Sequence, residues 1–347
     1  MASGPAWLRD FYPGYFALVM ATGIVDIAAR LLGYQAVALP LLAISLAAYL
    51  LLWAVLVARL ALFPRAVLAD FRSHQRGPGF LTIVAATGVI GGELGDFRLL
   101  AGVLPPLFWF SLALWVLLVY GFLSTATVGS VKPDLEQGLN GSWLLLTVAT
   151  ESVAILACSA ASRAVEPQAL AFAGLAFYLL GAVLYLLIIT LILLRWMFRP
   201  MLASDMDEAW WINMGAVAIA TLAGARLMSL PNVKPNLLPL LDFAAPFTVL
   251  LWVTSTFWIP LLAVLFVRKL VQRKSYSYSP SLWSMVFPLG MYTSATREYA
   301  AAVHLPFLRP IPRVMFWVAL LAWLVTFAAM CARLVRSMWQ PAATGAA

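Results

Sequence analysis

The sequence predicts an all-α integral membrane protein with ten transmembrane helices. Of its 347 residues, 64% are hydrophobic and only 10% are charged, whereas soluble domains carry about 25% charged residues. Apolar stretches of about 20 residues, the length at which a helix crosses a bilayer, recur along the chain. They are continuous and rich in Leu, Ala and Val, unlike the alternating segments of about ten residues that build a β-barrel.

The ten predicted spans use most of the chain, so we expect residues 1–347 to form a single polytopic membrane domain. In chain order they are approximately 12–33, 37–60, 79–96, 104–128, 141–162, 168–195, 208–230, 243–267, 282–303 and 312–334. The first span lacks a basic segment before it and a cleavage site after it, so we do not expect a cleaved signal peptide. Cys158 and Cys331 fall within spans and form neither a disulfide framework nor a metal motif, and we expect no metal or cofactor.

Lys and Arg are distributed unequally between the two sides of the membrane. Of the 22 such residues, 14 fall on the side that carries both termini and 8 on the other side. Because cytoplasmic loops are enriched in Lys and Arg, we expect a multi-pass protein of the cell membrane, inner or plasma, with both termini in the cytoplasm. The net charge of +8 mostly reflects this bias and requires no nucleic-acid partner.

The odd-numbered spans differ from the even-numbered spans in polarity. The cores of the even spans contain no charged residue and are bulky and aromatic, as lipid-facing helices are. The odd spans carry the charged residues Asp26, Arg30, Glu93, Glu151, Arg226, Arg297 and Glu298, together with many glycines. Small residues allow helices to approach closely, and ionisable residues at membrane depth usually face the bundle interior or an aqueous path. We therefore expect five odd helices inside and five even helices outside.

The odd spans also resemble one another, through "MATGIV", "AATGVI", "VATESV", "AIATLAG" and "GMYTSAT". Their threonines, Thr22, Thr87, Thr150, Thr221 and Thr293, are 65, 63, 71 and 72 residues apart. This period predicts one helical hairpin repeated five times with quasi-five-fold symmetry, and odd helices that run parallel around a central pore. The candidate pore-lining residues are Thr22, Gly23, Thr87, Gly88, Thr150, Glu151, Thr221, Pro288, Gly290, Thr293 and Thr296. The alternative for the threonines is hydrogen bonding between helices without a role in permeation.

Three segments carry a resemblance to a known family: "FALVMATGIVDIA", "NGSWLLLTVATESVAIL" and "FPLGMYTSAT". Together they resemble the tellurite-resistance/dicarboxylate transporter family, which includes the bacterial TehA proteins and the plant slow anion channels, and the likeness covers essentially the whole chain. The resemblance implies a homotrimer in which each subunit has its own pore for a small anion, either an inorganic anion or one like sulfite or a C4-dicarboxylate. It also implies a phenylalanine gate on the ninth helix, for which Phe287 is the best match.

The charges of the odd spans do not by themselves indicate anion selectivity, because acidic and basic residues are mixed. Glu151 is the candidate proton-coupling group if the protein is instead a proton-coupled dicarboxylate carrier. An enzyme is not expected, because the sequence shows no GxSxG, no HExxH and no Asp pair at membrane depth. Among proteins without a transport role, a cytochrome subunit needs histidine ligands within its spans, but His74 and His304 fall in or near loops.

Three further charges are expected at the outer mouth of the pore. Asp26, Arg226 and Arg297 follow the aligned threonines by four or five positions, which corresponds to about 6–8 Å along a helix. We expect Asp26 to pair with one of the two arginines and the other to attract anions. The alternatives are a local pair between Asp26 and Arg30, four residues apart on one helix, and an Arg297 side chain that extends outwards to water. Pro288 is expected to bend the ninth span.

Overall fold

The computed structural model describes residues 4–95, 102–130, 132–201, 207–231, 237–272 and 278–339. Over these residues the protein is helical and contains no strand. Nine helices within this described part are long and apolar enough to cross a membrane. The remaining predicted span is α13 (Trp283–Ala302), a 20-residue helix whose polar residues make it less apolar than the others. The protein is thus a multi-pass, all-helical membrane protein.

Two sets of long helices alternate along the chain. The odd predicted spans are α2 (Ala17–Leu31), α5 (Thr82–Gly95), α9 (Leu145–Ala161), α11 (Ile212–Met228) and α13. The even spans are α3 (Gln35–Leu62), α6 (Leu104–Trp115) continued through a π-helical turn into α7 (Gly121–Val128), α10 (Gln168–Phe198), α12 (Leu238–Gln272) and α14 (Pro310–Trp339). Three short helices, α1 (Ala6–Arg9), α4 (Pro64–Arg72) and α8 (Leu135–Gly138), were not anticipated from the sequence. The predicted end of the third span, residue 96, lies outside the described residues.

The two sets differ sharply in burial. The spans that contain α2, α5, α9 and α11 are 83–89% buried inside the protein, whereas the even spans are 22–39% buried. Most residues of α13 are also buried. The five buried helices contact one another in a closed circuit, in the order α2, α5, α9, α11, α13 and back to α2. We call them the inner helices and the even set the outer helices.

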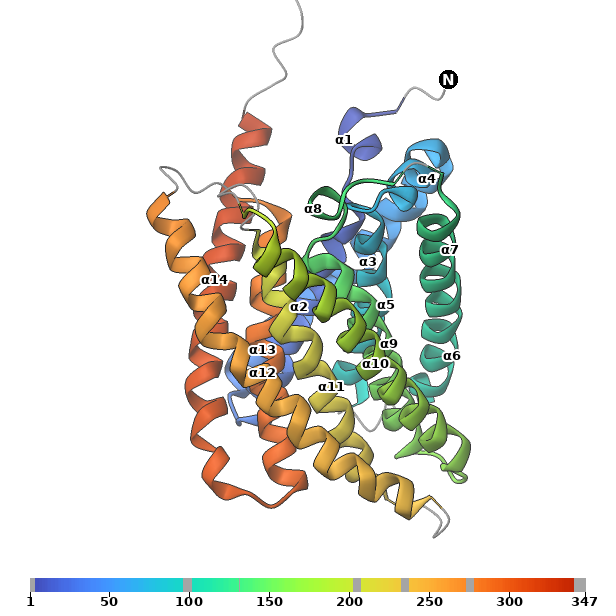
Figure 1. The fold of residues 1–347 in the computed structure, drawn as a ribbon, viewed down its shortest axis with the longest axis vertical. Helices are drawn as coiled ribbons and strands as arrows, with labels where there is room; N and C mark the ends of the chain where they lie inside the picture. Colours follow the sequence, from blue (N-terminus) through green and yellow to red (C-terminus); the bar gives the residue numbers. More distant parts are fainter. Residues whose placement is uncertain are drawn as a thin grey trace, which may run out of the picture.

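Each inner helix is preceded by a short 3₁₀ turn. These turns are Pro13–Phe16, Gly77–Leu81, Gly141–Leu144, Glu208–Trp211 and Pro280–Leu282. Proline stands in the first turn of three of them, where its missing N–H removes no helical hydrogen bond. Before the third turn, the side chain of Asn140 accepts a hydrogen bond from the backbone N–H of Ser142, at 2.9 Å. Figure 1 shows α1, α4, α8 and the C-terminal end of α14 at the same end of the molecule.

Glycines allow close approach within the inner circuit. A Cβ atom added at Gly215 on α11 would lie 2.7 Å from Cγ of Pro288 on α13, and one added at Gly88 on α5 would lie 2.8 Å from Cβ of Ser152 on α9. Helix α13 continues on both sides of Pro288. The glycine at position 215 therefore leaves the space in which the proline ring packs.

Candidate functional site

A cavity of about 360 Å³ lies where the inner helices begin. All five inner helices or their 3₁₀ turns contribute to its wall, through residues that include Ala17, Thr82, Leu145, Ile212 and Phe287. Since these residues lie in the first turns of their helices, except for Phe287, the inner helices all start at this cavity and run away from it. We call it the N-end cavity.

Both signs of charge line the N-end cavity, from Arg76, Glu136, Arg195 and Asp207. Arg195 donates a hydrogen bond to the carbonyl oxygen of Leu139, and its guanidinium lies 5.1 Å from the ring centroid of Trp210. Burial raises the pKa of Asp207 above its ordinary value, and the adjacent Glu208 carboxyl raises it further. The charge on this wall therefore depends on pH.

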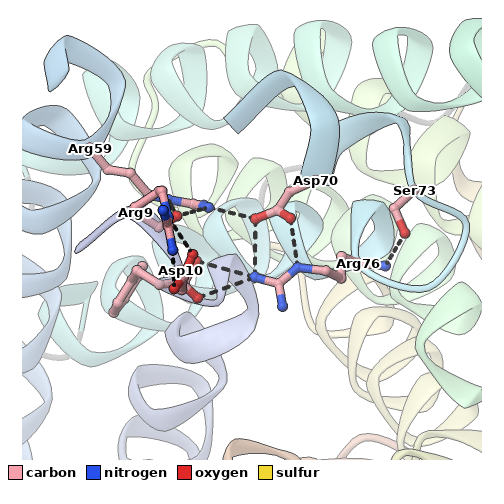
Figure 2. A network of polar contacts seen from close by, with 7 residues as sticks. Arg9, Asp10, Arg59, Asp70, Ser73 and Arg76 are labelled. Atoms are coloured by element: carbon pink, nitrogen blue, oxygen red, sulfur yellow. Dashed lines mark hydrogen bonds and ion pairs between the residues drawn. The ribbon is translucent and has the colours of Figure 1, made fainter. Parts of the chain in front are cut away.

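Arg76 is held by a network at the rim of the N-end cavity (Figure 2). Its Nε atom lies 2.7 Å from Oδ1 of Asp70, whose other oxygen accepts a hydrogen bond from Arg59 at 2.6 Å. Arg59 also donates to the carbonyl oxygen of Arg9 at 2.7 Å. The Asp70 carboxylate thus lies between two guanidiniums, and Arg59 connects α3 to both α1 and α4.

A second, smaller cavity of about 30 Å³ lies further along the same helices. Its wall includes one or more residues from every inner helix: Ile24, Gly88, Ser152, Ile219, Arg226 and Met291. Nε of Arg226 lies 3.3 Å from Oε2 of Glu298, so its charge is paired. We call this space the C-end cavity.

Phe287 lies at the inner end of the N-end cavity, on the side towards the C-end cavity. It lines the N-end cavity, whereas Met291, one helical turn later, lines the C-end cavity. On α2, Met20 lines the N-end cavity and Ile24, one helical turn later, lines the C-end cavity. Four residues of helix correspond to about 6 Å, and the two cavities have no lining residue in common. The side chains at this level, which include Phe287 and Met20, form the layer that separates the two cavities.

Most threonines of the predicted layer bond to aromatic side chains of the outer helices. Nε1 of three outer tryptophans donates to a threonine hydroxyl at 2.9–3.0 Å, in the pairs Trp323–Thr22, Trp115–Thr150 and Trp252–Thr296. Tyr49 and Thr87 form a fourth such pair, at 2.8 Å. Thr221 and Thr293 donate to carbonyl oxygens of their own helices. None of these six threonines lines either cavity, which favours the interhelical alternative.

Glu151 also points away from the two cavities. It is fully buried, and a Cβ atom added to Gly181 on the outer helix α10 would collide with its carboxyl oxygen. In the described part of the protein, neither carboxyl oxygen has a hydrogen-bond partner. Of the other predicted residues, Gly88 lines the C-end cavity, whereas Gly23 packs on Glu93 and Gly290 on Ile24.

The expected pairing of Asp26 with Arg226 or Arg297 is wrong. Asp26 forms an ion pair with Arg30, one turn away on the same helix face, and Arg226 pairs with Glu298. The four-residue spacing brings the Arg30 side chain within reach without any contribution from tertiary structure. Among the described residues, the half-buried Arg297 makes no ion pair, and it does not line the C-end cavity.

The pairing of Asp26 belongs to a polar cluster that the sequence analysis missed. Arg30 donates to the carbonyl oxygen of Glu93 at 3.0 Å, and Ser45 donates to the Glu93 carboxylate at 2.9 Å. The charged residues of the N-end cavity, including Arg76 and Arg195, enter the sequence prediction only through the count of Lys and Arg on each side of the membrane. Their position near the ends of the spans could have indicated a charged cavity entrance. The sequence does not give the rotation of each helix, which decides which of these charges face inwards.

Similarity to known proteins extends over most of the chain. A family model described as "Voltage-dependent anion channel" (SLAC1) matches residues 10–331. The chain belongs to the SLAC1 family. This confirms the resemblance noted from the sequence and makes the protein a membrane anion channel or transporter rather than an enzyme.

Relatives with curated names are similar over different parts of this SLAC1-family protein. An uncharacterized membrane protein of Mycobacterium tuberculosis is 34% identical over 148 residues, which cover 42% of this chain and 75% of the relative. An uncharacterized transporter of Methanocaldococcus jannaschii is 23% identical over 336 residues, 92% of each chain. The sulfite efflux pump SSU1 of Trichophyton rubrum is 24% identical over 352 residues, covering 92% of this chain and 90% of the pump.

Proposed function

We propose that this protein conducts small anions along the axis of its five inner helices and that Phe287 gates the path. One observation carries the proposal: two cavities, each lined by all five inner helices, are separated by the layer that contains Phe287. The inner helices surround this axis in a closed circuit of contacts. The five hairpins then form a quasi-five-fold unit with its own pore, and the family resemblance supports a homotrimer of such units.

The helix ends at the N-end cavity support anions as the permeating species. The first N–H group of each inner helix is bonded to the preceding 3₁₀ turn, but the macrodipole still places about half a positive charge at this end. Five helix N-termini meet here, together with Arg76 and Arg195. Helix N-termini bind anions for this reason. Glu136 and Asp207 oppose this effect, so the potential depends on their protonation and pairing.

The family and the size of the N-end cavity support the proposed substrate class. The similarity to a sulfite efflux pump supports inorganic or sulfite-like anions, and the N-end cavity of about 360 Å³ also has room for a C4-dicarboxylate. The alternative of a proton-coupled carrier gains no support from Glu151, because its side chain faces α10 rather than either cavity. The excess of Lys and Arg on the side of the termini supports a cytoplasmic N-end cavity.

The gate is tested by Phe287→Ala in proteoliposomes loaded with chloride, nitrate or sulfite. Removing the ring from the separating layer is expected to raise anion flux severalfold. Phe316→Ala is the matched control, because Phe316 is also buried but stacks on Tyr34 at a ring distance of 5.0 Å, at the outer helix α14. Both substitutions open a space in a packed region and lower stability, but only the first should change flux. Wild-type flux from folded Phe287→Ala protein contradicts the gating role.

A further inference from the structure

A third space, larger than the N-end and C-end cavities, lies on the outer surface of the protein, away from the axial path. It is a groove of about 490 Å³ between α12 and α14, with α13 as its floor. Phe266 and Leu270 of α12, Met285 and Leu289 of α13, and Leu321 and Val325 of α14 contribute to its walls. Among the described residues, no charged side chain lines it. We call it the α12–α14 groove.

The length of the α12–α14 groove matches one leaflet of a membrane. Its residues on α14 extend from Val318 to Ala329, a rise of about 16 Å at 1.5 Å per residue. The hydrocarbon core of a bilayer is about 30 Å thick, so half of it is about 15 Å. An apolar groove of this length on a membrane-facing surface fits one extended acyl chain.

One end of the α12–α14 groove is basic. Arg333 and Arg336 follow Ala329 by four and seven positions, so they continue the same face of α14 beyond the apolar lining. Nη1 of Arg333 donates to the carbonyl oxygen of Tyr278 at 2.7 Å, and its guanidinium lies 5.9 Å from the Tyr278 ring, which itself lines the groove. Both arginines are exposed. Their charge complements a phosphate headgroup at the C-terminal end of α14.

We propose that the α12–α14 groove binds an anionic phospholipid, with one acyl chain along the groove and the phosphate against Arg333 and Arg336. The floor residues Met285 and Leu289 lie on either side of Phe287 and Pro288 in α13. Pro288 has no N–H to donate, so α13 has one hydrogen bond fewer at this turn. The lipid therefore packs against the back of the helix that carries the gate. Only this last consequence rests on the proposed function.

Binding is tested by native mass spectrometry of the full-length protein in mild detergent, titrated with phosphatidylglycerol or phosphatidylcholine. The wild type is expected to retain phosphatidylglycerol preferentially. Replacing both arginines, in Arg333→Gln/Arg336→Gln, is expected to weaken this retention about fivefold for each arginine removed. Arg313→Gln, at the opposite end of α14, is the matched control and should leave retention unchanged.

A second pair of variants fills the groove without changing charge. Ala322→Phe and Ala329→Phe place a ring in the space of the acyl chain and should each reduce retention of both lipids at least tenfold, with thermal unfolding used to select folded protein. Wild-type retention in both filled variants, or in the double arginine variant, overturns the proposal. Dissociation of an oligomer by the filled variants with no loss of bound lipid also overturns it, because the groove is then a contact between copies. Lipid retention is measured without ion flux, so the result is independent of the proposed function.

Discussion

At the scale of single residues, Asp207 combines a place on the N-end cavity with a raised pKa. Lys269, paired with Glu208, and the hydroxyl of Ser281 oppose the rise, and Tyr12, Arg76, Glu136 and Arg195 line the same cavity. As the pH rises through the raised pKa, Asp207 gains a negative charge that repels anions. The free energy of unfolding that Asp207 contributes also falls as the pH rises from the ordinary aspartate pKa to the raised one.

Asp207→Asn is therefore expected to remove one component of the pH dependence of anion flux. The wild type should lose flux as the pH on the N-end side rises through the Asp207 pKa, whereas the variant should keep the high flux of the neutral side chain. The measurement is chloride or sulfite flux in proteoliposomes over a pH series. Glu136→Gln, at another carboxyl of the cavity, is the comparison. A variant with the wild-type pH profile would show that Asp207 does not face permeating anions.

Glu151 is expected to act on stability rather than on transport. Its carboxyl oxygens are buried without a hydrogen-bond partner in the described structure, and an unsatisfied buried polar group costs about 1–3 kcal/mol. Glu151→Leu, of similar size, should therefore raise the thermal unfolding temperature, and Glu151→Gln should leave the pH profile of flux unchanged. Loss of pH dependence in Glu151→Gln would instead support the proton-coupled carrier.

Whether a site residue could be predicted from the sequence depended on whether its contacts are local or formed by distant parts of the chain. The ion pair of Asp26 and Arg30 could be predicted, because it depends only on spacing along one helix. The direction of the threonines and of Glu151 could not, because a repeat of about 65–70 residues fixes the level of a residue and leaves the rotation of its helix undetermined. That rotation depends on the aromatic partners of the outer helices, such as Trp323, which are distant in sequence.

At the scale of elements, the bonds between outer aromatics and inner threonines connect the two sets of helices. Trp323→Phe removes the donor to Thr22 and is expected to lower the free energy of unfolding by about 0.6–1 kcal/mol. Thr22→Val should lower the free energy of unfolding by a similar amount. The double variant should lower it by little more, because both substitutions remove the same hydrogen bond. Flux per folded protein should stay at the wild-type level.

Thr293→Val provides the control for this cycle, because the Thr293 hydroxyl donates within its own helix, to Leu289. It should show no coupling with Trp323→Phe. A change in anion flux for Thr22→Val, without a change in stability, would return this threonine to the permeation path.

Long helices were easier to predict than their junctions. Hydropathy identified the spans, and the alternation of polar and apolar spans supported α13 although its own composition is the weakest. The 3₁₀ turns and the short helices α1, α4 and α8 carry too few residues for a periodic pattern. In α13 the interhelical bond comes from Thr296, about one turn after the aligned Thr293, so the aligned threonine is not the one that bonds to the outer helix.

At the scale of the whole molecule, charge at the far end of the path should control anion entry. Arg226 lines the C-end cavity, whereas Arg297 does not. Arg226→Gln is therefore expected to reduce anion uptake from that side, most strongly at low ionic strength, because salt screens exposed charges with a Debye length of about 8 Å at physiological strength. Arg297→Gln should have the smaller effect. Equal, wild-type flux from both variants across a salt series would remove the charged mouth from the mechanism.

The five inner helices also have a consequence for the electrical behaviour of the protein. All of them start at the N-end cavity, so their dipoles point the same way and add. The outer helices run in the opposite direction, but they lie further from the axis and so oppose this field less there. The conduction path thus has a built-in polarity even where its side chains are uncharged. An anion that enters from the N-end cavity is attracted at the start of the path. An anion that enters from the opposite side reaches this attraction only at the end of the path. If this axis conducts anions as proposed, its current–voltage relation is expected to be asymmetric because of the backbone, so that current passes more easily in one direction.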